Sequence, residues 1–304
     1  MRLAVLSDIH AILPPLQAVL PEIKARQVDG IIVAGDMLAG PNPVEVLRLL
    51  RELDCWMIRG NQENYLLRFY NANAPDWWYT CRQWSFMRWN FQQLDQESLE
   101  FIASLPEQRS LSLPGTDPIR VVHGSPRDAS ELVFPEKDLP LLDLSLSLVP
   151  EPVLIFGHTH LSWQMRRAGR LALNPGALSG NFTSKSCGGY AILDWDKDHW
   201  NAELCEVHFD VSLIRKSFEE SGLFQAAGAI STYWLQSIET GIDILPRFID
   251  YAFQMAHEAG YPQTPYVPDH IWEQADALFA AEIANGNSPL LAGLPGYLSA
   301  KDRA

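Results

Sequence analysis

Residues 3–10, LAVLSDIH, form an apolar run that ends in polar residues, and this pattern predicts a buried strand. The pattern returns in IIVAGD at 31–36 and in CWMIRGN at 55–61. The segments between them, 14–26 and 41–53, begin with prolines, which fit the first turn of a helix. The first 60 residues therefore predict the order β-α-β-α-β and a largely parallel sheet.

An aromatic-rich segment follows, and strand patterns return after it. Residues about 62–105 are predicted to form a helical insert. Its rings either pack the insert onto the core, which we favour, or form a wall beside the site that stacks on a base or aryl group. Short turns such as Ala168-Gly169 predict antiparallel pairing for the later strands. These further strands are predicted at 109–113, 119–123, 153–156, 162–167, 170–174, 190–195 and 200–209.

From about residue 211 the pattern becomes helical again. Amphipathic stripes at 244–256 and 271–283 predict two helices, separated by prolines 262, 265 and 268. The sequence thus predicts a main domain over 1–210 and an acidic helical extension over 211–304. We interpret the extension as a cap packed on the main domain, in preference to an independent binding module.

The composition excludes several classes of protein. The 304 residues are 47% hydrophobic, which excludes intrinsic disorder, and 23 Lys and Arg against 37 Asp and Glu give a net charge of −14. A large nucleic-acid-binding surface needs clustered cations and is not expected. The four scattered cysteines form no C-x-x-C pair, so reduced thiols are expected. No apolar run is long enough to span a bilayer, and we expect a cytoplasmic protein without membrane contact.

Polar clusters that contain aspartate, asparagine and histidine follow five of the predicted strands. The residue spacing in Asp8-x-His10 and His158-x-His160 lets both side chains of each pair point toward one side of a fraying strand end. Carboxylate, imidazole and amide oxygen suit Mn, Fe, Zn or Ni better than a thiolate site would. We therefore expect a metal site made from Asp8-Ile9-His10, Gly35-Asp36, Gly60-Asn61, His123-Gly124 and Gly157-His158-Thr159-His160.

The ordered motifs D-x-H, G-D, G-N, H-G and G-H-x-H, over about residues 1–209, resemble the calcineurin-like metallophosphoesterase superfamily. The likeness is greatest to its small bacterial and archaeal phosphodiesterases. The resemblance implies an α/β (α+β) fold, a four-layer α-β-β-α sandwich of two facing mixed sheets, here with the C-terminal helical extension. It also implies two divalent ions, with Mn expected and Fe, Ni or Zn accepted. One ion would be held by Asp8, His10, Asp36 and His160, and the second by the bridging Asp36 with Asn61, His123 and His158.

The resemblance further implies hydrolysis of a phosphate ester by attack of a metal-bridging hydroxide, with Asp36, Asn61 and His123 as catalytic residues. Many members have a histidine after G-N, whereas this chain has Gln62, which cannot release a proton. Glu63 either replaces that acid or is a first-turn helix carboxylate, and we favour the second interpretation. The Asp-Arg-Gly of protein phosphatases is absent at Met37-Leu38-Ala39-Gly40, which favours a phosphodiesterase.

The expected partner is a small phosphate-ester substrate. Arg59 and Arg127 stand beside the predicted ligand loops and are candidate phosphate contacts, with a solvated surface position as the alternative for each. Two other functions stay open: a phosphomonoesterase or protein phosphatase on the same site, and a non-catalytic protein-binding scaffold on this fold. The sequence carries no signal for oligomeric state.

Overall fold

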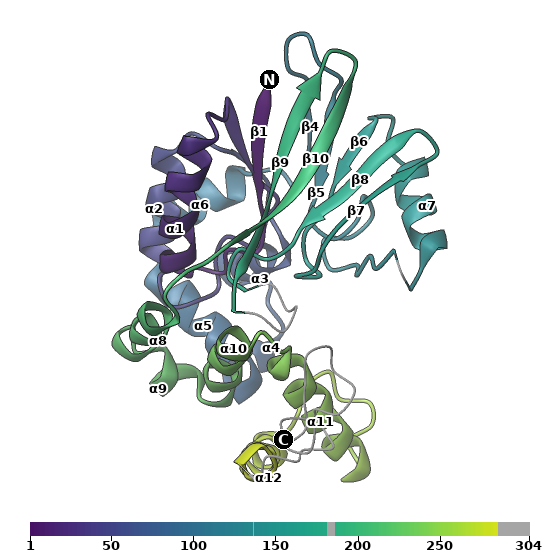
Figure 1. Ribbon diagram of the computed structural model, residues 1–304. Helices are drawn as coiled ribbons and strands as arrows, with labels where there is room; N and C mark the ends of the chain where they lie inside the picture. The colour runs from purple at the N-terminus through teal and green to yellow at the C-terminus, as the bar shows by residue number, and fades with distance from the viewer. Residues whose placement is uncertain (136, 181–185, 285–304) are drawn as a thin grey trace, which may run out of the picture.

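The computed structural model describes residues 1–135, 137–180 and 186–284, and two five-stranded sheets face each other within it (Figure 1). The first sheet has the order β10-β9-β1-β2-β3, and the second has the order β4-β5-β6-β8-β7. The first comprises β1 (Arg2–Leu6), β2 (Gly30–Val33), β3 (Trp56–Met57), β9 (Gly188–Asp196) and β10 (His199–Val207). The second comprises β4 (Gln108–Leu111), β5 (Ile119–Val122), β6 (Val153–Ile155), β7 (Ser162–Arg167) and β8 (Arg170–Pro175).

Both sheets are mixed. β1, β2 and β3 are parallel, which confirms the prediction from the first 60 residues, while β9 and β10 join the sheet antiparallel. In the second sheet β5, β6 and β8 are parallel, and β4 and β7 pair antiparallel at its edges. The predicted sandwich of two facing mixed sheets is confirmed.

Helices lie outside the sheets and at one end of them. Helices α1, α2 and α6 lie beside the first sheet and α7 beside the second (Figure 1). The first part of the chain forms α1 (Leu13–Ala25), α2 (Pro43–Glu52), α3 (Asn61–Tyr70), α4 (Asp76–Thr80), the 3-10 helix η1 (Arg82–Trp84), α5 (Ser85–Gln93), α6 (Gln96–Ser104) and α7 (Leu139–Ser147). The later part forms α8 (Val211–Glu220), α9 (Leu223–Ala227), α10 (Ala229–Thr240), α11 (Ile244–Glu258) and α12 (Asp269–Ala284).

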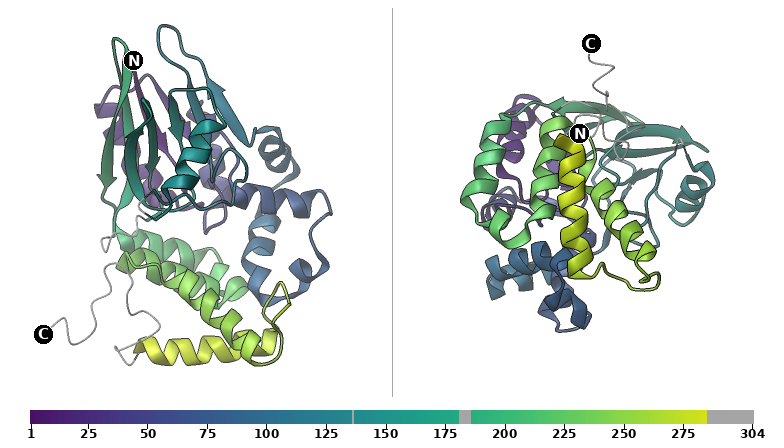
Figure 2. Two further views of the ribbon diagram at one scale, coloured as in Figure 1. Left: turned by 90° about the vertical axis from the view of Figure 1, so that its right-hand side faces the viewer. Right: turned by 90° about the horizontal axis from the view of Figure 1, so that it is seen from below.

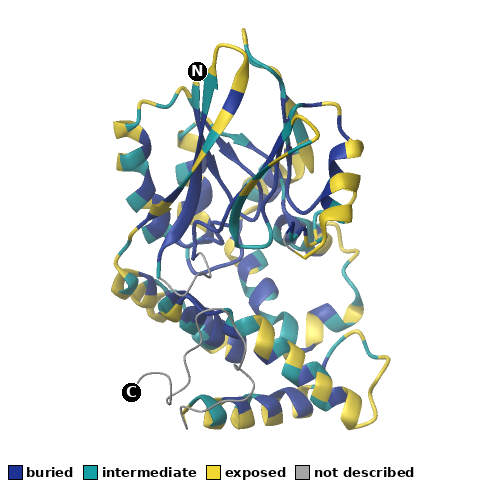
Figure 3. Ribbon diagram, turned by 45° about the vertical axis from the view of Figure 1, so that its right-hand side comes forward, coloured by how far each residue is buried: buried dark blue, intermediate teal, exposed yellow. Residues whose placement is uncertain are grey.

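Successive side chains of β1 point alternately to the two faces of the sheet, and each face packs against a different layer. Leu3 and Val5 belong to the core between the sheets, whereas Ala4 and Leu6 belong to the core shared with the helices. All four side chains are fully buried because β1 is covered on both faces (Figure 3). A third apolar cluster joins the outer face of the second sheet to Leu142 of α7.

The helical insert packs against the C-terminal helices (Figure 2). The rings of Trp78 and Trp84 stack with centroids 3.5 Å apart, and Trp77 stacks on Tyr266 at 5.4 Å. Arg82 also pairs with Glu273 of α12. The structure therefore shows that Trp77 and Trp78 have the packing role that we favoured for the insert rings.

The structure bears on the expectations about membrane-spanning helices, cysteines and domain division. No helix of the described residues combines the length and apolar content that a bilayer crossing requires. All four cysteines lie in the described part of the chain, and no disulfide joins them. The division at residue 210 stays a prediction, and residues 285–304 of the expected extension lie outside the described residues.

Candidate metal centre

The carboxyl ends of five strands bring the seven predicted ligands to one end of the sandwich. Asp8 and His10 follow β1, Asp36 follows β2, and Asn61 begins α3 just beyond β3. From the second sheet, His123 directly follows β5, and His158 and His160 follow β6. The two sheets face each other, so their strand ends deliver side chains to a shared space, as open α/β sheets do with their ligands.

These side chains form two clusters with ligand-like spacing. Asp8, His10 and His160 each offer an atom within 4.8 Å of the others, and Asp36, His123 and His158 do the same. Asp36 lies between the clusters, since its Oδ2 is 3.1 Å from His123 Nε2 and 4.0 Å from His10 Nε2. That position suits a carboxylate that bridges two ions.

The rings of His123 and His158 are oriented by backbone carbonyls. His123 Nδ1 lies 2.7 Å from Ala34 O, and His158 Nε2 lies 3.1 Å from Ser130 O. A carbonyl only accepts, so each of these nitrogens carries the proton in a neutral ring and the other nitrogen keeps its lone pair. Such a second partner is what orients a metal-binding imidazole.

Several buried oxygen and nitrogen atoms that can bind a metal ion face one another. In the neutral ring, with Nδ1 protonated, His123 Nε2 is an acceptor, and it lies 3.1 Å from Asn61 Oδ1. Asp8 Oδ1 and Asp36 Oδ2 are buried and have no hydrogen bond among the described residues. A divalent cation would satisfy such a set of oxygen and nitrogen ligands. The residues present therefore fit two divalent ions.

The local charges support this interpretation. Burial alone would lower the pKa of His123, but the carboxylates of Asp36 and Asp8 outweigh it and raise that pKa to about 10. Burial lowers the pKa of His10 to about 4, with His160 acting in the same direction. The two carboxylates thus hold a positive charge at His123, and a divalent ion bound there must displace its proton.

Backbone strain marks the same residues. Positive φ angles occur at Asp8 (53°), His10 (51°), Asp36 (48°), His158 (67°) and His160 (57°). A non-glycine residue in this region costs on the order of 1–3 kcal/mol and persists where the surroundings impose it. Here hydrogen bonds between loops impose it, such as His10 N to Asp36 O at 2.9 Å. Of the twelve non-glycine residues with positive φ in the described part of the chain, five are predicted ligands, and such strain is often found at functional sites.

Comparison with known domain families agrees with this geometry. The family model of the calcineurin-like phosphoesterase superfamily domain matches residues 1–198 of this chain. The chain belongs to the calcineurin-like phosphoesterase superfamily. As a phosphoesterase of this superfamily it is a hydrolase that acts on phosphoric esters, and the superfamily uses divalent metal ions.

Relatives of this phosphoesterase occur in archaea and bacteria. A protein of Methanocaldococcus jannaschii, described as uncharacterized, is 27% identical over 236 residues, 72% of this chain and 90% of its own. A metallophosphoesterase from Sphaerobacter thermophilus is similar in structure, with a TM-score of 0.63 and 24% identity over 79% of this chain and 100% of its own. A hypothetical protein from Pyrococcus horikoshii gives a TM-score of 0.66 and 17% identity over 79% of this chain and 98% of its own. The two solved structures show the shared fold.

Glu63 has a larger structural role in this phosphoesterase than its sequence position indicated. It lies in the first turn of α3, as favoured, but it is fully buried. Its carboxylate accepts hydrogen bonds from Asp36 N at 2.9 Å, Leu38 N at 2.9 Å and Gly60 N at 2.8 Å. Burial, with Asp36 nearby, raises the pKa of Glu63 to about 7. Glu63 is a positioning residue that connects the Asp36 loop to α3. The sequence feature that could have indicated this role is the position of Glu63 three residues after the Gly60 N-cap.

The two predicted arginine contacts lie in different places. Arg59 pairs with Glu107 at 3.3 Å and lines neither of the two cavities that the candidate ligands border. Arg127 pairs with Glu131 and lines the smaller of these cavities, together with Asn61. Phosphate contact stays a prediction for both, and the placement favours Arg127.

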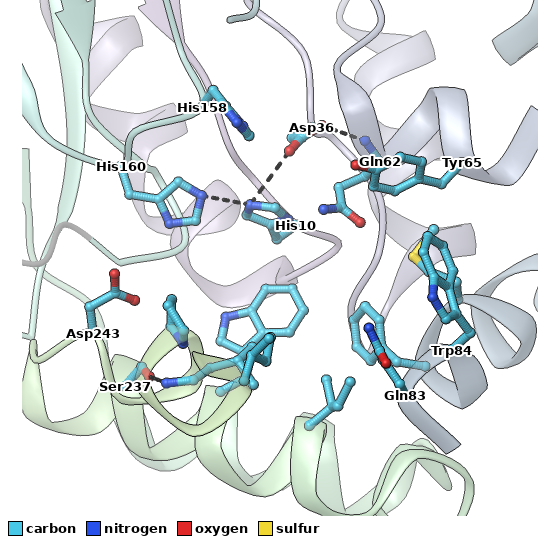
Figure 4. A pocket seen from close by; sticks show the side chains of 17 residues that line it. His10, Asp36, Gln62, Tyr65, Gln83, Trp84, His158, His160, Ser237 and Asp243 are labelled. Atoms are coloured by element: carbon cyan, nitrogen blue, oxygen red, sulfur yellow. Dashed lines mark hydrogen bonds and ion pairs between the residues drawn. The ribbon is translucent and has the colours of Figure 1, made fainter. Parts of the chain in front are cut away.

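The two cavities have volumes of about 300 Å³ and 200 Å³. His10, Asp36, His158 and His160 line the larger one, and Gln62 projects into it (Figure 4). Asn61 lines the smaller one, and Tyr65 lines both. The candidate metal centre is therefore accessible from two neighbouring spaces.

Proposed function

We propose that this phosphoesterase is a cytoplasmic phosphodiesterase that works with two divalent ions, Mn being favoured. Asp8, His10, Asp36 and His160 would hold one ion, and Asp36, Asn61, His123 and His158 the other. The observation that carries the proposal is the convergence of these seven side chains, together with the buried Asp8 Oδ1 and Asp36 Oδ2, which make no hydrogen bond among the described residues. The proposed substrate is a small phosphate ester.

Bound ions of this kind neutralise charge on phosphate oxygens and lower the pKa of water at the site. The chain's own residues would keep the ligands in place. Gln62 N donates to Asp36 Oδ1 at 2.9 Å, and Asp36 Oδ2 then faces the histidines. His158 N donates to Asp8 Oδ2 at 3.0 Å, and Asp8 Oδ1 then faces His160 Nε2 at 3.4 Å. One oxygen of each aspartate is thus used for orientation and the other for the ion.

The preference for a diester is supported by the two cavities. A diester carries two organic groups, and the candidate ligands border one cavity for each. The smaller cavity is polar and includes Arg127, whereas the larger is mostly apolar.

The first test is hydrolysis of bis-p-nitrophenyl phosphate by metal-stripped protein, with and without added Mn. We expect turnover that needs the metal and disappears in His158→Ala, because that change removes one proposed ligand. His257→Ala is the matched control, since His257 is exposed on α11. Faster hydrolysis of p-nitrophenyl phosphate would favour the phosphomonoesterase, and silence on both esters with metal bound would favour the scaffold.

A further inference from the structure

The larger cavity begins at the candidate metal ligands and is closed by two segments distant in sequence. His10, Asp36, His158 and His160 form one side of it (Figure 4). The facing side comes from η1 and α5 of the insert and from α10 and α11 of the C-terminal helices. A group attached to a phosphate at the metal centre would therefore extend between the insert and these helices.

This facing side is aromatic and aliphatic. Trp234 of α10 meets the ring of His10 edge to face, with centroids 5.0 Å apart, so the apolar wall starts beside a candidate ligand. Aromatic faces and aliphatic side chains favour burial of an apolar group, because the apolar area removed from water stabilises the complex. The wall is formed chiefly by Trp84, Phe86, Met87, Ile230, Trp234 and Ile249.

The charges that line the cavity argue against a second anion. Among the described residues that line it, none is Lys or Arg. Besides Asp36, the acidic lining residue is Asp243, which lies beside His160 (Figure 4). A second phosphate or carboxylate buried here would lose its water without gaining a cation, which is unfavourable. The smaller cavity differs, because it includes Arg127.

We propose that the larger cavity binds one uncharged aromatic or aliphatic group of the ester, and so selects esters in which this group carries no second anion. The volume of about 300 Å³ suits a group of one or two rings and is at the lower end for small-molecule sites. This inference rests on the proposed function, because it needs the phosphate to bind at the metal centre.

Non-hydrolysable phosphonates test the inference by calorimetry on Mn-loaded protein. We expect phenylphosphonate to bind at least tenfold more tightly than methylphosphonate, because only the phenyl ring reaches the apolar wall. The 4-carboxyphenylphosphonate should lose most of that gain, since its carboxylate meets no cation. Equal affinity for the phenyl and methyl compounds would overturn the inference.

Variants on α11 localise the effect. Ile249→Trp should fill the cavity and remove the preference for phenyl, while methylphosphonate binds as before and thereby shows that the variant is folded. Met255→Trp is the matched control, because Met255 is half-buried on the same helix and does not line the cavity. Leu245→Arg, which adds a cation to the lining, should recover affinity for 4-carboxyphenylphosphonate.

The outcomes separate the two proposals. Methylphosphonate binding with no phenyl preference, or a preference that survives Ile249→Trp, would overturn the cavity assignment and leave the metal centre intact. Failure of every phosphonate to bind protein shown to contain Mn would overturn the metal-centre proposal, and the cavity assignment with it.

Discussion

Asp36 connects the two candidate clusters, because its carboxylate contacts a histidine of each. One oxygen accepts from Gln62 N, and the other is 3.1 Å from His123 Nε2 and within 4.0 Å of His10 Nε2. His123 and His10 belong to different clusters, so removal of this single charge would weaken both.

Asp36→Asn should lower metal content and hydrolysis together. Loss of a supporting group alone costs a metal site about 10–100-fold in affinity or activity, so loss of a bridging ligand should cost at least as much. Metal per chain and turnover of bis-p-nitrophenyl phosphate are measured on the same preparation. Asp250→Asn, at an exposed position of α11, is the control. Activity at the wild-type level in Asp36→Asn would show that the site assignment is wrong.

Glu63→Gln should weaken the metal centre without touching a ligand. The amide retains the size of the carboxylate, but its NH₂ group faces at least one backbone N–H that now has no acceptor. An unsatisfied buried donor costs about 1–3 kcal/mol, so the thermal midpoint and the metal affinity should both fall. Thermal unfolding of metal-free protein and a Mn titration are the measurements. Unchanged values in both would contradict the positioning role.

Gln62→His should restore a proton donor beside the larger cavity. General acid help is worth roughly 10²–10⁴-fold where the leaving group is poor, and much less for nitrophenol. Rates on an alkyl ester and on a nitrophenyl ester are compared, with Gln92→His at an exposed position of α5 as the control. An equal effect on both esters would refute the explanation.

At the scale of elements, local patterns predicted the strands well. The strand Ser162–Arg167 has the predicted ends, and β1, β2 and β3 each lie within the predicted runs or one residue beyond. Helix α7 was not predicted, because Leu142, Leu144 and Leu146 alternate with polar residues in the period of a strand. Its helical start is fixed instead by the Asp138 side chain, which accepts from Leu141 N.

The site could be predicted only in part, because local patterns do not encode contacts with distant parts of the chain. Strand-end motifs are local, and they identified the seven side chains that converge. The left-handed backbone at Asp8 and the hydrogen bonds that Glu63 accepts from Asp36 N and Leu38 N are imposed by other loops, and no local pattern encodes them. The same holds for Trp234, which meets His10 although the two lie far apart in the chain.

The turn between β3 and α3 should tolerate no side chain at Gly60. A Cβ there would lie 2.1 Å from Asp36 Oδ1 and 2.6 Å from Asp36 N, so Gly60→Ala must displace Asp36. We expect a loss of metal binding comparable to that of Asp36→Asn, measured as metal per folded chain. Gly180→Ala is the control, because its Cβ would meet only ordinary contacts at 3.6–3.9 Å. Full metal content in Gly60→Ala would contradict the close approach.

At the scale of the whole molecule, the metal centre joins the two sheets. Its ligands come from both, so bound ions would hold the strand ends of β1 and β2 against those of β5 and β6. Without ions, the charges of Asp8 and Asp36 are balanced by histidine protons, as the raised pKa of His123 indicates.

Chelation should therefore lower the stability of the entire chain. An ion at 100 times its dissociation constant stabilises the native state by about 2.7 kcal/mol, provided that the unfolded chain does not bind it. We expect a lower thermal midpoint in EDTA, recovery with Mn, and a smaller response in His158→Ala. Identical midpoints with and without Mn would argue against a metal centre at this junction.

The larger cavity is lined partly by residues of the region that matches the superfamily and partly by the C-terminal helices, and this has an evolutionary consequence. All seven candidate ligands lie within the region that matches the superfamily, whereas Trp234, Asp243 and Ile249 lie beyond residue 198. Substitutions in α10 and α11 can therefore alter which ester is accepted while the hydrolytic motifs stay unchanged. Two relatives with identical motifs can then occupy different metabolic niches, and the C-terminal helices are the segment in which their divergence should be sought.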